Sequence, residues 1–86
     1  MMADKTKINR LLKTARGQLD GILAMVEDDR YCIDISNQLL AAQAILKKAN
    51  KEILTAHLMG CVKSAKSEEA LDEKLKELAA TMDKLL

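Results

Sequence analysis

Hydrophobic residues recur at three- and four-residue steps along most of the chain, which is the spacing of one face of an α-helix. The first such segment reads INRLLKTARGQLDGILAMV, and Asp4 or Thr6 just before it can cap the helix N-terminus. Polar residues at about 28–31 then interrupt the pattern. We therefore predict a first helix over about residues 5–28.

Two further segments carry the same periodicity. The second contains no proline and predicts one helix over about residues 32–62, which is long for so small a chain. The third begins at Ser67, a favourable N-cap followed by two glutamates, and predicts a helix over about residues 67–85. The chain is therefore expected to be all-α, with three helices in a single domain over residues 1–86.

The composition limits how this chain can build a core. It has no proline, no Phe or Trp and one tyrosine, so Leu, Ile, Ala, Met and Val must fill the interior. At 86 residues a single core is only marginally stable, and we expect the protein to bury more surface by forming oligomers. We interpret the methionines within helical segments as core residues and assign no metal-ligand role to the five methionines.

The chain shows no feature of a membrane or secreted protein. No apolar segment is long enough to span a bilayer, and the N-terminus lacks the apolar stretch of a signal peptide. We therefore expect a cytoplasmic protein whose two cysteines are thiols rather than a structural disulfide. The formal net charge is +1, but basic residues dominate the first twenty positions, which suggests a face that binds a polyanion.

The stretch TAHLMGC places His57 and Cys61 four residues apart in the second predicted helix, where they share a face. The only other cysteine, Cys32, lies at the start of the same helix. At about 1.5 Å per residue, Cys32 and His57 lie roughly 37 Å apart in a continuous helix. One straight helix cannot bring all three donors to one ion, whereas two antiparallel copies can. We therefore predict a two-fold dimer in which one chain's Cys32 joins the other chain's His57 and Cys61.

Two thiolates and one imidazole form a soft, three-coordinate set that suits Cu(I). Structural zinc prefers four ligands, and nickel or cobalt prefers more nitrogen and oxygen donors than a chain with one histidine offers. The spacing alone leaves another interpretation open. In that interpretation the cysteines are small buried thiols and His57 is a hydrogen-bonded structural residue.

A longer motif carries a family resemblance. The segment RLLKTARGQLDGILAMVEDDRYCIDISNQLLAAQAIL, followed by HLMGC, resembles the CsoR/RcnR family of bacterial metal- and stress-sensing transcriptional repressors, over about residues 5–80. The resemblance implies an antiparallel four-helix-bundle dimer that assembles into a dimer-of-dimers tetramer without a helix-turn-helix. It also implies that the apo protein binds operator DNA, and that Cu(I) releases it and derepresses copper-resistance genes.

The combination of Cys32, His57 and Cys61 is similar to the copper(I)-sensing branch of that family. In this branch a tyrosine precedes the first cysteine and a glutamate lies on the third helix, and Tyr31 and Glu77 match those positions. The resemblance implies that both lie near the histidine, where either can hold its free N–H. Without the resemblance, Tyr31 is interpreted as a packing residue and Glu77 as a solvated carboxylate.

Basic side chains supply the candidate DNA contacts. Arg10, Lys13 and Arg16 recur at three-residue steps on the first predicted helix, and Lys48 belongs to a lysine cluster midway along the second. For any single lysine a solvated helix face is the more common explanation, but the resemblance favours this set as phosphate contacts. No base-reading module is evident, so DNA shape and a few arginine contacts are expected to give specificity. The expected partners are operator DNA, further copies of the chain and a copper chaperone as metal donor.

Other classes of protein remain to be distinguished. A related persulfide-sensing repressor would use Cys32 and Cys61 but would not need His57. Nickel- or cobalt-sensing members use an early histidine that MMADKTK lacks, and formaldehyde-sensing members lack the second thiolate. A copper chaperone or storage bundle usually exposes paired cysteines, which are far apart here. We do not expect an enzyme, because one histidine without a convergent polar pocket offers little for catalysis.

Overall fold

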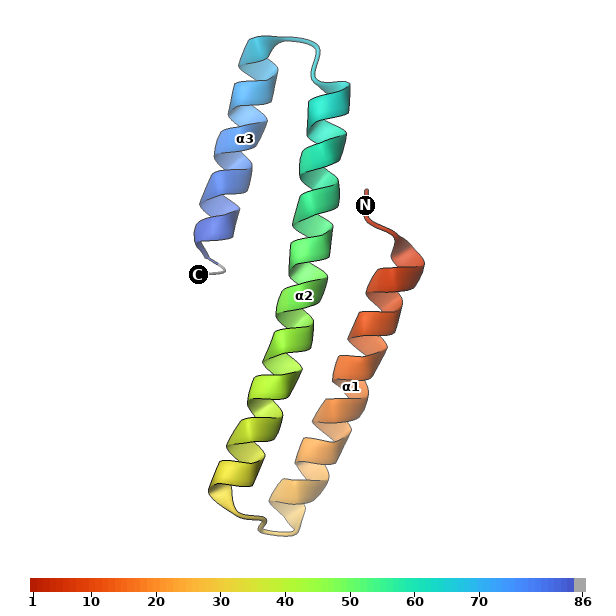
Figure 1. Ribbon diagram of the computed structural model, residues 1–86, viewed down its shortest axis with the longest axis vertical. Helices are drawn as coiled ribbons and strands as arrows, with labels where there is room; N and C mark the ends of the chain where they lie inside the picture. Colours follow the sequence, from red (N-terminus) through yellow and green to blue (C-terminus); the bar gives the residue numbers. More distant parts are fainter. Residues whose placement is uncertain (85–86) are drawn as a thin grey trace.

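The computed structural model describes residues 1–84, and these form three α-helices (Figure 1). They are α1 (Lys5–Glu27), α2 (Cys32–Ser64) and α3 (Glu68–Asp83). α1 and α3 lie on opposite sides of α2, as Figure 1 shows. The predicted all-α fold with three helices is confirmed. The predicted end of the third helix, Leu85, lies outside the described residues.

Side-chain caps explain where α1 and α3 begin. The Asp4 carboxylate accepts hydrogen bonds from the backbone N–H groups of Thr6 and Lys7. The Ser67 hydroxyl accepts one from the backbone N–H of Ala70, at 3.0 Å. Each bond satisfies an N–H group that would otherwise have no partner in the first helical turn.

α2 extends slightly beyond its predicted end and passes through Gly60 without a break. The helix continues to Ser64, two residues beyond the predicted end at Val62, and Ala65 then adopts an extended conformation. The Ser64 hydroxyl donates a hydrogen bond to the Gly60 carbonyl at 2.8 Å, within the last turn. The result is one unbroken helix of 33 residues. Like the other helices within residues 1–84, it is not apolar enough to cross a membrane.

α1 packs antiparallel against α2 through small and branched side chains at seven-residue steps. The buried residues of this contact are Ile8, Ala15, Ile22, Ala42 and Ala49. The alanines let the two helix backbones approach closely, because their side chains end at Cβ. The Lys7 ammonium and the Glu52 carboxylate, 3.0 Å apart, add an exposed ion pair between the same two helices.

The three helices form a single layer. The chain measures 57 × 26 × 12 Å, and 12 Å is about the diameter of one helix with its side chains. Its radius of gyration is 17.3 Å, against roughly 12 Å for a compact domain of this length. The solvent-accessible surface is 6797 Å², against roughly 5,000 Å² for a compact protein of this mass. A layer of this thickness encloses little interior.

The hydrophobic stripes predicted as core are therefore only partly buried within one chain. Large side chains of α1 and α2 that stay exposed include Leu12, Leu19, Leu23, Val26, Ile33, Leu39, Leu40 and Leu46. Among the described residues no large side chain is completely buried. The periodicity correctly identified helical faces, but much of the apolar surface on those faces has no neighbour in the same chain.

Candidate metal centre

His57 and Cys61 lie next to each other near the C-terminal end of α2. Nε2 of His57 is 3.5 Å from Sγ of Cys61, because a four-residue step places both side chains on one helix face. Cys61 is buried and His57 is half-buried. Two donors that each bind one ion at about 2.0–2.3 Å are separated by roughly this distance, so the pair fits a shared metal ion.

Cys32 lies at the opposite end of the same helix. It is the first residue of α2 and is exposed. Because α2 is continuous, the twenty-five steps from Cys32 to His57 correspond to roughly 37 Å along the helix axis. Within the described part of the chain, no group of three or more His, Cys, Asp or Glu side chains can hold one ion. The structure therefore brings two of the three predicted ligands together and separates the third.

Glu77 shares a pocket with His57. The pocket has a volume of about 240 Å³ and lies between α2, α3 and the N-terminal residues. The Glu77 side chain is 64% exposed, and its carboxylate pairs with the Lys74 ammonium at 3.7 Å. Over residues 1–84 no hydrogen bond joins Glu77 to His57. Glu77 therefore lines the same pocket as His57 but forms no hydrogen bond with it in this conformation.

Tyr31 is placed with Cys32 rather than with His57. It is the N-cap residue of α2, makes no side-chain capping bond, and is 67% exposed. The length of α2 separates it from His57 of the same chain. Its predicted place near the histidine therefore requires the histidine of another chain.

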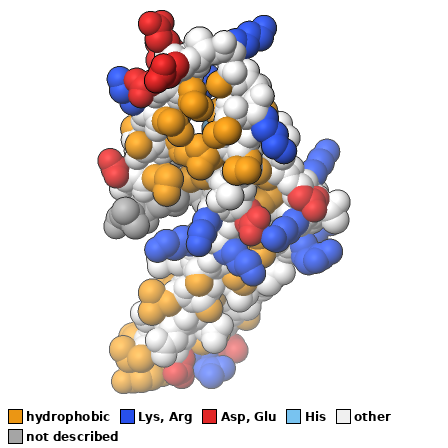
Figure 2. Space-filling view, turned by 45° about the horizontal axis from the view of Figure 1, so that its top comes forward, with side chains coloured by type: hydrophobic (Ala, Val, Ile, Leu, Met, Phe, Trp, Pro, Cys, Tyr) orange, Lys and Arg blue, Asp and Glu red, His pale blue; other side chains and the backbone are white. Residues whose placement is uncertain are grey.

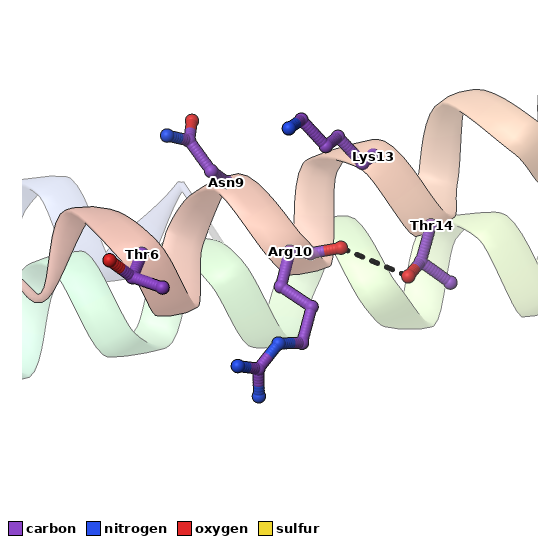
Figure 3. Close-up of a pocket in the computed structure, with 5 residues that line it drawn as sticks. All are labelled: Thr6, Asn9, Arg10, Lys13 and Thr14. Carbon is purple, nitrogen blue, oxygen red and sulfur yellow. Dashed lines mark hydrogen bonds between the residues drawn. The ribbon is translucent and has the colours of Figure 1, made fainter.

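The predicted DNA-contacting side chains are all exposed. Arg10, Lys13 and Arg16 lie on α1 and Lys48 lies on α2. Figure 3 shows Lys13 and Arg10 pointing away from different sides of α1. At about 100° per residue, the three basic residues of α1 spread over roughly 120° of the helix surface. Figure 2 shows Lys and Arg side chains gathered across the middle of the molecule, beside a hydrophobic patch.

Two residues outside the predicted set adjoin these sites. Asn9 points to the same side of α1 as Lys13 and lines the same shallow groove (Figure 3). Its four-residue spacing from Lys13 is a signal that could have identified it. Met2 lines the pocket that contains His57. No periodicity relates Met2 to α2, so only the folded structure reveals this contact.

A family comparison determines the class of the protein. The family model described as "metal-sensitive transcriptional repressor" matches residues 4–84. The chain belongs to this family. The resemblance to the CsoR/RcnR repressors is thereby confirmed. The family consists of metal-sensitive transcriptional repressors rather than enzymes, in agreement with the expectation from the sequence.

Among members of this repressor family, the chain is 45% identical over 78 residues to the copper-sensing transcriptional repressor CsoR of Mycobacterium ulcerans strain Agy99. That match covers 84% of this chain and 66% of the relative. CsoR of Bacillus subtilis strain 168 is 42% identical over 76 residues, covering 84% of this chain and 75% of the relative. The chain spans about half to two thirds of the length of the mycobacterial CsoR relatives.

Two solved structures of metal-responsive repressors share the fold, each with a TM-score of 0.81. The copper-sensing repressor CsoR with Cu(I) from Geobacillus thermodenitrificans NG80-2 is 36% identical, covering 98% of this chain and 91% of that chain. The nickel-responsive transcriptional regulator InrS is 26% identical, covering 100% of this chain and 97% of that chain. Because proteins that respond to different metals share this fold, the donor set must identify the metal.

Proposed function

We propose that this repressor responds to copper(I). In the metal-free state it binds operator DNA, and Cu(I) held by Cys32, His57 and Cys61 releases it, so that copper-resistance genes are expressed. The observation that carries the proposal is the distribution of soft donors on α2, with an adjacent imidazole and thiol at one end and an exposed thiol at the other. The likeness to copper-sensing repressors supports the choice of metal.

The donor set favours Cu(I) over the other metals considered. Thiolate is a soft donor and imidazole a borderline one that also suits copper, and Cu(I) accepts three such donors. Zinc in a structural site takes four ligands, and nickel takes nitrogen and oxygen donors that a chain with one histidine does not supply. Bound Cu(I) would supply a fixed link between the residues that hold it.

A second copy of the chain completes the site in this proposal. The chain exposes about 1,800 Å² more surface than a compact protein of its mass, which is within the range that obligate dimers bury per subunit. The exposed hydrophobic residues of α1 and α2 would cover one another in a second layer. Antiparallel packing about a two-fold axis places Cys32 of each chain beside His57 and Cys61 of the other. Two such dimers form the proposed tetramer.

DNA binding is assigned to the exposed basic side chains Arg10, Lys13, Arg16 and Lys48. A symmetric assembly repeats this set in every subunit, so a small local excess of positive charge can contact many phosphates. Each neutralised phosphate releases counterions, and the affinity for DNA therefore falls steeply as salt is added. Phosphate contacts position the protein, while the shape of the duplex supplies much of the specificity.

Release of DNA requires that Cu(I) bind more tightly to the DNA-free conformation. When His57 uses one ring nitrogen as a ligand, its other nitrogen carries an N–H that needs an acceptor. Glu77, on the far side of the same pocket, can accept that hydrogen bond if it leaves Lys74. This exchange would draw α3 toward α2 and move the basic faces out of register with the duplex. Couplings of this kind are worth about 1–3 kcal/mol.

An anaerobic DNA-binding titration under reducing conditions tests the proposal. We expect the apo protein to bind operator DNA, Cu(I) to weaken that binding, and equal amounts of Ni(II) or Zn(II) to leave it unchanged. Release by nickel or zinc but not by Cu(I) would contradict the assignment of the metal. Release by a persulfide donor without a response to Cu(I) would instead support thiol-stress sensing through the exposed Cys32 and the buried Cys61.

A further inference from the structure

The N-terminal residues fold back onto the end of α2 that carries His57 and Cys61. Figure 1 shows the N-terminus beside the C-terminal half of α2. There the Met2 side chain lies directly on Gly60. A Cβ placed on Gly60 would overlap the Met2 sulfur and would lie 2.8 Å from the methyl carbon Cε of Met2. The glycine therefore provides the space that the Met2 thioether occupies.

Gly60 lies between the two candidate ligands of α2. It follows His57 by three residues, or about 4.5 Å along the helix axis, and directly precedes Cys61. Met2 also lines the 240 Å³ pocket that contains His57. Met2 as a residue remains 58% exposed, so it is not part of an enclosed hydrophobic core. The thioether thus contacts α2 at a residue that lies within one helical turn of both His57 and Cys61.

We propose that the Met2 sulfur is a further Cu(I) ligand at the site formed by His57 and Cys61. This inference rests on the proposed copper-sensing function. A thioether is a soft, neutral donor that favours Cu(I) over harder divalent ions. The three flexible torsions of methionine let its sulfur move the short distance from Gly60 to a shared ion. One chain then offers thioether, imidazole and thiolate donors before Cys32 of a second copy joins the site.

Two substitutions separate ligation from packing. Met2→Leu keeps an apolar side chain of similar volume and removes the sulfur. Gly60→Ala displaces the Met2 thioether, whose flexible end can shift, while alanine itself favours the helix. Met59→Leu is the matched control, because Met59 is 52% exposed on the same helix and lies about 200° around it from His57.

The first measurement is selenium X-ray absorption on selenomethionine-labelled protein loaded anaerobically with Cu(I). We expect a copper neighbour of selenium in the unsubstituted protein and in Met59→Leu, and its loss in Met2→Leu. The second measurement is Cu(I) affinity by competition with a chromogenic chelator. Met2→Leu and Gly60→Ala should each weaken the affinity by about tenfold, the double variant no further, and Met59→Leu not at all. Zn(II) affinity should not change in Met2→Leu.

The outcomes distinguish this inference from the function on which it rests. Copper binding that depends on His57 and Cys61, but shows no selenium neighbour and no loss in Met2→Leu, would overturn the role of Met2 and leave the proposed function intact. Absence of tight Cu(I) binding in the unsubstituted protein would overturn both. Thermal unfolding of Gly60→Ala at or above the temperature of the unsubstituted protein would show that its weaker copper binding is not caused by unfolding.

Discussion

His57 has two neighbours of different chemistry, and they suggest two separate tasks for one imidazole. On its own helix the neighbour is the Cys61 sulfur, at 3.5 Å, with which it can share an ion. Across the pocket the neighbour is Glu77 of α3, which is paired with Lys74. In the proposed function, the first contact serves metal binding, and the second can carry a structural change to another helix. The two tasks can be separated by mutation.

His57→Ala is expected to keep tight Cu(I) binding, because two thiolates remain, but to lose the response of DNA binding to Cu(I). The loss corresponds to the coupling free energy, about 1–3 kcal/mol or roughly 5- to 150-fold in DNA affinity. Cu(I) competition and fluorescence anisotropy with labelled operator DNA measure the two effects. Thr55→Ala, exposed on the same helix, serves as the control. Undiminished release of DNA by Cu(I) in His57→Ala would exclude the relay through Glu77.

The pairing of His57 with Cys61 could be predicted from the sequence, because a four-residue step on a helix leaves little freedom. The separation of Cys32 could be predicted for the same reason, since the rise per residue is fixed. The approach of Glu77 depends on the turn between α2 and α3, and the sequence suggested it only through a family resemblance. The contact of Met2 with Gly60 joins residues 58 positions apart and leaves no periodic trace.

At the scale of helices, the close contact between α1 and α2 depends on alanines. Ala42 is 3% exposed and faces α1, whereas its neighbour Ala41 is exposed. We expect Ala42→Leu to lower the free energy of unfolding by about 1–3 kcal/mol, because the larger side chain would push the two helices apart. Ala41→Leu should have a much smaller effect. Urea unfolding at one fixed chain concentration measures both, and equal effects would show that the helices are not tightly packed at Ala42.

The number of helices and their starting caps could be predicted, since periodicity and N-cap chemistry are local properties. The partner of each helical face could not, because periodicity shows that a face is apolar but not what covers it. Gly17 and Gly21 illustrate this limit. Their four-residue spacing is typical of close packing against another helix, yet apart from adjacent residues and the helix's own backbone, no atom within residues 1–84 lies within 4 Å of a Cβ placed on either. α1 therefore does not use these glycines against α2.

At the scale of the whole molecule, the proposed site must be shared between chains, and mixing of variants tests this directly. Cys32→Ala and Cys61→Ala chains each lack one thiolate in every site and should bind Cu(I) weakly. After the two are unfolded and refolded together, half the dimers are mixed and each contains one intact site. The mixture should regain about a quarter of the original tight binding capacity. No regain, or tight binding by either variant alone, would contradict the shared site.

The distribution of charge gives a second test at this scale. Lys13→Ala should weaken DNA binding and reduce the slope of log affinity against log salt, by about 0.9 for each phosphate contact that is lost. Because the assembly repeats Lys13 in every subunit, the slope should fall by more than the value for a single lost phosphate contact. Lys76→Ala is the control, since Lys76 lies on α3 and pairs with Asp72 at 3.1 Å. Equal slopes for Lys13→Ala and the unsubstituted protein would remove Lys13 from the DNA-binding surface.

The 12 Å thickness of the chain has a consequence for how much repressor a cell must make. In the proposed dimer, a layer of helices one helix deep buries additional surface against the second copy, so association would stabilise the folded chain. The folded fraction then rises with total chain concentration. At chain concentrations where the folded fraction is low, freshly synthesised protein would be exposed to proteases. A low chain concentration would therefore limit repression of the target genes. A rise in thermal unfolding temperature with protein concentration would reveal this dependence.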